Sequence, residues 1–155
     1  MGLVRSHVLV SSGGAVRLVL DASESHGTGT GRFVLFTAGA GIHHVALFTA
    51  NLRRSAVALD ARGALLLPMT DTYYDDFATR WNLNDAAIKM LQEHGLMYDS
   101  DGTDEFWHLY TDAFQERFFF EVVQRRGGYA GFGAANAPVR AAAQARQHRA
   151  DAGFL

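Results

Sequence analysis

The stretch Arg117–Arg125, Arg-Phe-Phe-Phe-Glu-Val-Val-Gln-Arg, is the segment of this chain that decides the fold. Aromatic and β-branched residues fill it, which favours one long strand. Side chains alternate between the two faces of a strand, so Phe119, Glu121 and Val123 share a face. A carboxylate among such apolar neighbours costs several kcal/mol unless it is paired or bound to a metal ion. Two interpretations of Glu121 stay open: a metal or catalytic role, or an ion pair with an arginine at either end of the stretch.

The segments before and after this strand show further strand and helix patterns. Asp101-Gly102 is a strong turn signal between two strand-forming runs, and it predicts a hairpin over 96–111. His44–Thr49 favours another strand, and Asn51 can cap a helix that Gly63 ends. The other predicted elements are strands at 4–10, 16–21 and 64–68, helices at 73–81 and 85–94, and an Ala-rich helix capped by Asn136 and running to about Arg149. The run 32–37 fits either a strand or a helix.

The order of these elements indicates an α+β fold. From His44 onward it runs strand, helix, strand, inserted helices, two strands and a long strand. This order predicts a βαβββ unit with a helical insertion between its second and third strands, preceded by two further strands. No segment is rich enough in proline or charge to act as a linker, so a single domain over 1–155 is predicted.

The composition excludes several classes of function. The 14 basic and 16 acidic residues give a net charge of -2, which argues against binding to nucleic acid or to a membrane surface. The chain has no cysteine, so disulfides, thiolate catalysis and zinc–thiolate sites are excluded. The N-terminus lacks a signal-peptide pattern, and no apolar run reaches the ~20 residues of a membrane span. A cytoplasmic location is therefore expected.

His44, at the start of its predicted strand, is a second candidate ligand. An imidazole and a carboxylate suit non-haem Fe(II), whose usual protein ligands are two histidines and one carboxylate. No other histidine stands at a spacing from His44 or Glu121 that would identify it as the second one. A purely structural role for His44 stays open at this point.

Four motifs together carry a resemblance to a known family. They are Gly-Ile-His-His-Val-Ala-Leu at 41–47, Asp-Thr-Tyr-Tyr at 71–74, Phe-Glu-Val-Val-Gln-Arg at 120–125 and Gly-Phe-Gly-Ala-Ala-Asn at 131–136. In this order they resemble the C-terminal part of 4-hydroxyphenylpyruvate dioxygenases, in the vicinal-oxygen-chelate superfamily. The stretch 117–144 more closely resembles the dioxygenase-like domain fused behind a sugar-phosphate-isomerase-type barrel in some bacterial 3-dehydroshikimate dehydratases.

The resemblance implies a vicinal-oxygen-chelate fold with a curved mixed sheet. It divides the chain into a remnant of a preceding unit at 1–37, a βαβββ unit at 38–126, and a Gly-rich loop with the C-terminal helix at 127–155. In the family the first iron-binding histidine lies on the opening strand of the preceding unit. This chain therefore supplies two of three expected ligands, and a longer natural protein, a late start codon or a second chain are the alternatives for the third.

The resemblance also implies roles for individual residues. His44 and Glu121 fall on two ligands of Fe(II) or another divalent metal, with no catalytic residue beyond them. The positions implied to contact substrate are Ser6, Asp21, His108, Tyr110, Phe132 and Asn136. Four positions depart from the family pattern: Asp21 replaces a neutral amide, His43 and His108 each replace a glutamine, and Ala137 replaces a phenylalanine.

The implied function is Fe(II)-dependent oxygenation of an aromatic or 2-keto acid small molecule, as in aromatic catabolism, incomplete in this chain. The alternative is a non-catalytic dioxygenase-like domain or fragment of a fused 3-dehydroshikimate dehydratase. Strand edges left open by the missing half-unit invite pairing with other chains. They predict a homodimer, or a setting within a longer chain.

Overall fold

The computed structural model describes residues 3–81, 84–115 and 117–152. The chain forms two compact units, residues 1–43 and residues 44–155. Each unit is described by itself below. The prediction of a single domain stays a prediction.

The first unit is a hairpin followed by one helix. Strands β1 (Val4–Val10) and β2 (Arg17–Ser23), close to the predicted strands at 4–10 and 16–21, pair antiparallel. The run for which strand and helix were both open is helical, within α1 (Gly29–Phe36). Thr28 caps this helix by accepting a hydrogen bond from the backbone N–H of Gly31. The apolar side chains of the hairpin are exposed, Leu9 by 57%.

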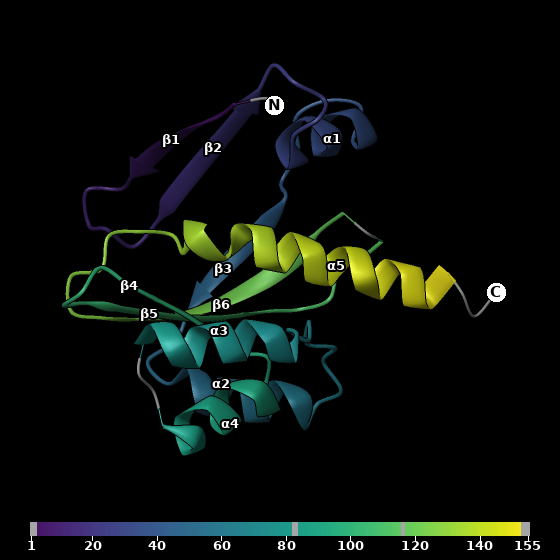
Figure 1. Cartoon of the computed structure of the whole chain (residues 1–155). Coiled ribbons are helices and arrows are strands. Elements are labelled where there is room, and N and C mark those ends of the chain that lie inside the picture. Colours follow the sequence, from purple (N-terminus) through teal and green to yellow (C-terminus); the bar gives the residue numbers. More distant parts are fainter. Residues whose placement is uncertain (1–2, 82–83, 116, 153–155) are drawn as a thin grey trace. The chain divides into compact units, whose positions relative to one another are not determined.

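The second unit is built on one four-stranded mixed sheet in the order β3-β6-β5-β4 (Figure 1). Strand β3 (His44–Phe48) runs parallel to β6 (Phe119–Arg126). Strand β6 pairs antiparallel with β5 (Glu105–Tyr110), which pairs antiparallel with β4 (Met97–Ser100). The predicted curved mixed sheet of the vicinal-oxygen-chelate type is confirmed.

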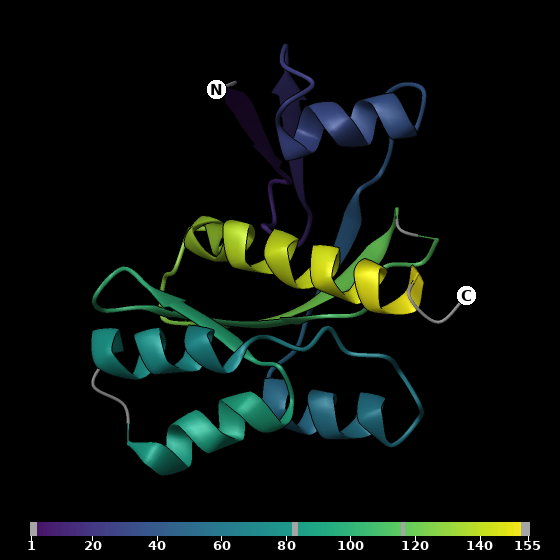
Figure 2. The same ribbon diagram turned by 45° about the vertical axis from the view of Figure 1, so that its right-hand side comes forward.

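Helices cover the two faces of this sheet unequally (Figures 1 and 2). Helices α2 (Leu52–Asp60), α3 (Asp71–Trp81) and α4 (Asp85–Glu93) lie on one face. A short 3-10 turn, η1 (Ala134–Asn136), and helix α5 (Ala137–Ala152) lie on the other. Asn51 caps α2 as predicted, because its side chain accepts from the backbone N–H of Arg54.

The alternation of each strand sends its side chains into two separate cores. On the α2–α4 face, Leu109 of β5 packs in a buried cluster whose helical members include Leu52 and Tyr74. On the α5 face, Phe119 and Tyr110 pack with Ala143 of α5. The α5 face is also the one that carries Glu121, because Phe119 and Glu121 lie two residues apart on β6.

The structure corrects the predicted place of the helical insertion. The predicted strand at 64–68 is only an isolated bridge, between Leu66 and Thr111. The backbone of Leu67 still donates to Tyr110, but Pro68 has no N–H to continue the ladder. Helices α3 and α4 therefore precede β4, the second strand of the unit, rather than follow it.

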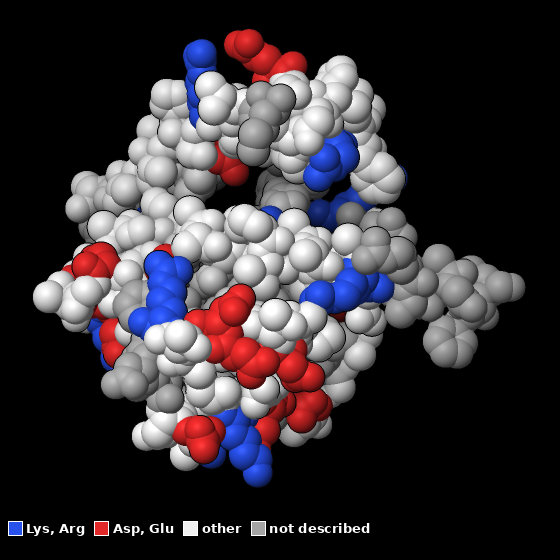
Figure 3. Space-filling view, viewed as in Figure 1, with Lys and Arg blue, Asp and Glu red and all other residues white. Residues whose placement is uncertain are grey.

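Charged side chains of both signs are spread over the surface in the view of Figure 3. Acidic side chains gather over α3 and α4, whose exposed acids are Asp71, Asp75, Asp76, Asp85 and Glu93. In the part of the chain that the structure describes, none of the helices is both long enough and apolar enough to cross a membrane.

Candidate metal centre

Glu121 lies in the middle of the sheet, on the face under α5. In the strand register it stands between Ala46 of β3 and Tyr110 of β5. Only 6% of the residue is exposed. Because the edge strand β3 pairs in parallel with β6, its register determines which β3 side chain lies near the Glu121 carboxylate.

His44 and Glu121 come together on this face. His44 is in register with Phe119, two residues before Glu121, so the three side chains project from the same side of the sheet. The His44 Nε2 atom lies 3.8 Å from Glu121 Oε2, and the imidazole stacks on the Phe119 ring at 5.0 Å. Two bonds of about 2.1 Å to one ion span at most about 4.2 Å, so a single cation can reach both atoms.

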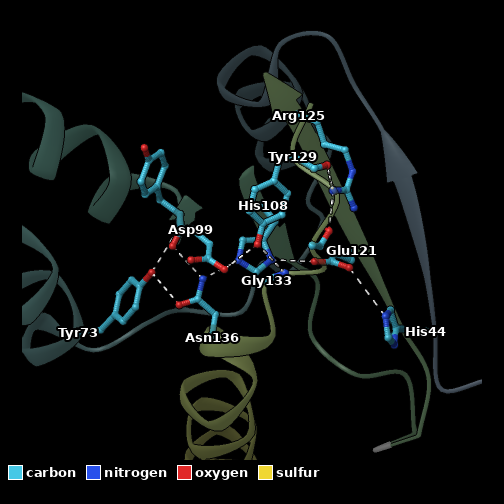
Figure 4. Close-up of polar contacts among 11 residues, drawn as sticks. His44, Tyr73, Asp99, His108, Glu121, Arg125, Tyr129, Gly133 and Asn136 are labelled. Carbon is cyan, nitrogen blue, oxygen red and sulfur yellow. Dashed lines mark hydrogen bonds and ion pairs between the residues drawn. The ribbon is translucent and has the colours of Figure 1, made fainter. Parts of the chain in front are cut away.

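The other Glu121 oxygen is bonded to His108, a residue with no exposed surface. His108 Nδ1 lies 2.7 Å from Glu121 Oε1, and Figure 4 shows the carboxylate between the two histidines. Glu121 is thus paired with imidazoles rather than with Arg117 or Arg125, the two arginines that the sequence left open. His108 Nε2 lies 2.9 Å from Asn136 Nδ2, so both ring nitrogens are engaged within the protein.

Asn136 does not cap α5 as predicted. Its amide turns toward β4, the edge strand of the sheet, where Nδ2 also donates to the backbone oxygen of Tyr98 at 2.9 Å. The amide oxygen accepts from the Tyr73 hydroxyl at 3.4 Å. The physical reason is that buried polar groups need hydrogen-bond partners. Strand β4 is at the edge of the sheet, so no further strand can bond its Tyr98 backbone oxygen, and the Asn136 amide bonds both this oxygen and His108.

Arg140, on α5, is the functional candidate that sequence analysis missed. Its guanidinium lies 4.9 Å from the ring centre of Phe119 and 5.6 Å from that of Tyr110, both on the Glu121 face. It donates to Gln144 Oε1 at 2.7 Å. Among the described residues no carboxylate lies within ion-pair distance of it. The i, i+4 spacing of Val139 and Ala143, which both pack on the sheet, could have placed Arg140 beside this face.

Burial and charge shift the titration of the groups around Glu121. Burial, followed by the Glu121 charge, raises the pKa of Tyr110 well above its usual value. Burial lowers the pKa of Arg140, while Tyr110 and Glu121 oppose this shift. An arginine remains charged at neutral pH after a moderate decrease, so Arg140 brings a positive charge to the same face as the Glu121 carboxylate.

The Gly-rich loop between β6 and η1 is fastened at both ends of its turn. Arg125 donates to the backbone oxygens of Tyr129 at 2.9 Å and Gly131 at 2.6 Å. The Tyr129 hydroxyl donates to Asp99 Oδ2 at 2.7 Å and accepts from the backbone N–H of Gly133. Burial raises the pKa of Tyr129 to about 12, and the bond to Asp99 adds to it. Phe132, implied to contact substrate, is 38% exposed on this loop, and the Arg125 guanidinium lies 5.6 Å from its ring centre.

Ser6 and Asp21 belong to the first unit. They face each other across the β1–β2 register, and the Ser6 hydroxyl donates to Asp21 Oδ1 at 2.5 Å. Both residues are exposed. The other six residues implied by the resemblance, His44, His108, Tyr110, Glu121, Phe132 and Asn136, all belong to the second unit.

His44 and Glu121 fit two positions of a divalent metal site. They offer one imidazole nitrogen and one carboxylate oxygen, and the second carboxylate oxygen carries the outer hydrogen bond that ligating carboxylates usually have. Within the described ranges no group of three or more His, Asp or Glu side chains is arranged to hold a metal ion. The pair therefore supplies two ligands of a metal site that needs a third.

Comparison with known proteins points to one kind of fusion protein. The chain is 42% identical over 149 residues to a 3-dehydroshikimate dehydratase of Pseudomonas aeruginosa, covering 96% of this chain and 24% of that protein. It is 38% identical to a solved xylose isomerase-like TIM barrel/4-hydroxyphenylpyruvate dioxygenase fusion protein, with a TM-score of 0.77 over 92% of this chain and 23% of that one. The chain is similar to the C-terminal, dioxygenase-like part of these proteins.

More distant similarity extends to the dioxygenases themselves. A 4-hydroxyphenylpyruvate dioxygenase of Danio rerio is 35% identical over 112 residues, 67% of this chain and 28% of that protein. A variant of 4-hydroxymandelate synthase from Streptomyces coelicolor, at 24% identity and a TM-score of 0.78, shares the fold. No protein-family model matches the chain. The chain spans about a quarter of the length of the curated relatives it matches.

Proposed function

We propose that His44 and Glu121 bind a divalent metal ion, Fe(II), in a dioxygenase-like domain that oxygenates a 2-keto acid. The observation that carries this proposal is the 3.8 Å approach of His44 Nε2 to Glu121 Oε2 on the face under α5. The third ligand of the usual two-histidine, one-carboxylate set would come from a longer polypeptide or from a second chain. Similarity to 4-hydroxyphenylpyruvate dioxygenases supports the choice of metal and reaction class.

Each residue of the face has a task in this proposal. Glu121 supplies a carboxylate oxygen and His44 a ring nitrogen, and the stacked Phe119 ring fixes the plane of that imidazole. Helix α5 and the buried rings of Phe106 and Tyr110 shield Glu121 from water, whereas the His44 side chain is 39% exposed. Fe(II), when bound, supplies the redox chemistry of the oxygenation. Arg140 attracts the carboxylate of the keto acid.

A second candidate is a non-catalytic dioxygenase-like domain of a fused 3-dehydroshikimate dehydratase. The comparison within one organism favours it: identity to the P. aeruginosa dehydratase is 42%, whereas identity to the P. aeruginosa 4-hydroxyphenylpyruvate dioxygenase is 28%. The buried His108, bonded through both nitrogens, stands where the resemblance implies a substrate-contacting glutamine. In this case the domain would support a partner domain rather than oxidise a substrate.

Two measurements test these candidates. Anaerobic titration with Co²⁺ or Fe²⁺ is expected to show binding to the 155-residue chain that is lost in His44→Ala and in Glu121→Gln. His94→Ala, at the end of α4 on the opposite face of the sheet, is the control and retains binding. Equal binding by all four proteins, or none by the wild type, would contradict the metal site. Oxygen uptake with 4-hydroxyphenylpyruvate by the longer natural protein then separates a dioxygenase from a non-catalytic domain.

A further inference from the structure

The buried polar groups next to Glu121 form one continuous series of hydrogen bonds, each with a defined direction (Figure 4). The backbone N–H of Tyr98 donates to the Tyr73 hydroxyl at 3.3 Å, and this hydroxyl donates in turn to Asn136 Oδ1 at 3.4 Å. Asn136 Nδ2 donates to the Tyr98 backbone oxygen at 2.9 Å. A carbonyl oxygen can only accept, so Tyr98 determines which end of the Asn136 amide faces β4.

The fixed Asn136 amide determines the tautomer of His108. An amide nitrogen only donates, so His108 Nε2, 2.9 Å from Asn136 Nδ2, accepts and carries no proton. The single proton of the neutral ring is then on Nδ1, which donates to Glu121 Oε1 at 2.7 Å. The opposite tautomer would set two donors against each other at Asn136 and two acceptors against each other at Glu121.

We propose that His108 is a positioning residue that holds the Glu121 carboxylate so that Oε2 faces His44. The proposal rests on the proposed metal site. His108 has no exposed surface and no nitrogen lone pair left, so it is neither the missing third ligand nor a contact for substrate. Its role is to prevent rotation of the carboxylate, which leaves Oε2 at 3.8 Å from His44 Nε2 before any ion arrives.

A pre-oriented carboxylate raises metal affinity because binding does not have to restrict its rotation. Hydrogen bonds to ligating groups typically contribute 10–100-fold to metal affinity. The orientation of each ligand matters most where few side chains coordinate the ion, and the described residues offer only two. The buried relay from β4 to Glu121 thus connects an edge strand of the fold to the geometry of the metal site.

A matched pair of variants tests the positioning role in the 155-residue chain. His108→Leu keeps about the volume of the imidazole but offers no donor, whereas the smaller asparagine of His108→Asn keeps an N–H donor at the place of Nδ1. We expect His108→Leu to weaken Co²⁺ binding about 10–100-fold, and His108→Asn to retain most of the affinity. If both variants bind Co²⁺ as tightly as the wild type, the positioning role is overturned while the metal site stands.

A measurement on metal-free protein tests the relay separately from metal binding. The ring ¹⁵N resonances of His108 are expected to show a protonated Nδ1 and an unprotonated Nε2. In Asn136→Leu, Nδ1 is expected to stay protonated because Glu121 Oε1 still accepts from it, and only the Nε2 resonance is expected to shift as its donor is lost. A protonated Nε2 in the wild type would refute the inference whatever the metal titration gives. Failure of the wild type to bind Co²⁺, with the expected tautomer present, would instead refute the proposed function.

Discussion

Removing the carboxylate of Glu121 in metal-free protein has a stability effect that the structure allows us to estimate. The matched variants are Glu121→Gln and Glu121→Leu, which have similar volume and therefore leave little cavity. Both remove the negative charge from a residue that is 6% exposed. Only Glu121→Gln keeps an oxygen that can accept from His108 Nδ1, now 2.7 Å from Oε1.

The leucine variant leaves a buried donor without an acceptor. His108 has no exposed surface, so water cannot replace the lost oxygen. An unsatisfied buried N–H costs about 1–3 kcal/mol, and relief of the buried carboxylate offsets part of the loss. We therefore expect Glu121→Leu to lower the free energy of unfolding by about 2 kcal/mol and Tm by about 4–8 °C. Glu121→Gln is expected to cost less than about 1 kcal/mol.

Calorimetry and urea denaturation in the presence of a chelator measure both differences. The expected order of stability is wild type, then Glu121→Gln, then Glu121→Leu. A leucine variant as stable as the wild type would show that the bond between His108 and Glu121 is absent. A glutamine variant as unstable as the leucine variant would show that an amide oxygen cannot replace the carboxylate as the acceptor for His108 Nδ1.

Four further predictions concern titration, packing, activity and assembly. All five tyrosines have raised pKa values, with Tyr73 and Tyr129 at about 12. Tyrosine in the unfolded chain titrates at about 10, so the folded protein is expected to keep its stability below that pH and to lose it as the pH rises toward ~12. Equal tyrosinate absorbance of native and denatured protein at pH ~10 would contradict this expectation. Gly133→Ala is expected to lower the free energy of unfolding by about 1–3 kcal/mol, because Gly133 has a φ of 62° and an added Cβ would lie 2.8 Å from the Phe106 ring. The control Gly13→Ala places its Cβ in open space and is expected to stay near wild type in urea denaturation. The isolated chain is expected to form homogentisate far more slowly than about 1 s⁻¹, and a product assay at or above that rate would refute the incomplete metal site. Sedimentation is expected to show a homodimer or larger assembly, and a clean 16.9 kDa species would refute it.

The order of strands and most helix boundaries could be predicted from the sequence, because local signals determine them. Asp101-Gly102 marks the β4–β5 turn and Asn51 caps α2, and both act within a few residues. The 64–68 run carried the same apolar signal as a strand. This run forms no strand because its pairing depends on an available partner strand and is ended by Pro68, and the apolar pattern reports neither of these factors.

The resemblance implied a shared role for His44 and Glu121, but nothing in the sequence indicated that His108 would be the hydrogen-bond partner of Glu121. Alternation correctly set Glu121 among apolar neighbours and raised the question of its partner. The hydrogen-bond partner of Glu121 is His108, which lies on β5. Only the β5–β6 register determines its distance from Glu121. Asn136 was assigned a local capping role because capping is visible in sequence. Its actual bonds reach 28 and 38 residues back along the chain.

The charges on the Glu121 face point to an anionic ligand once a cation is present. Without metal, the Arg140 guanidinium and the Glu121 carboxylate offset each other, and Glu121 favours the charged form of Arg140. His108 contributes no charge in the assigned tautomer. A divalent ion bound to Glu121 therefore adds two positive charges beside the rings of Phe119 and Tyr110. Because a buried excess charge is unfavourable, a carboxylate-bearing aromatic ligand suits this face better than a neutral one.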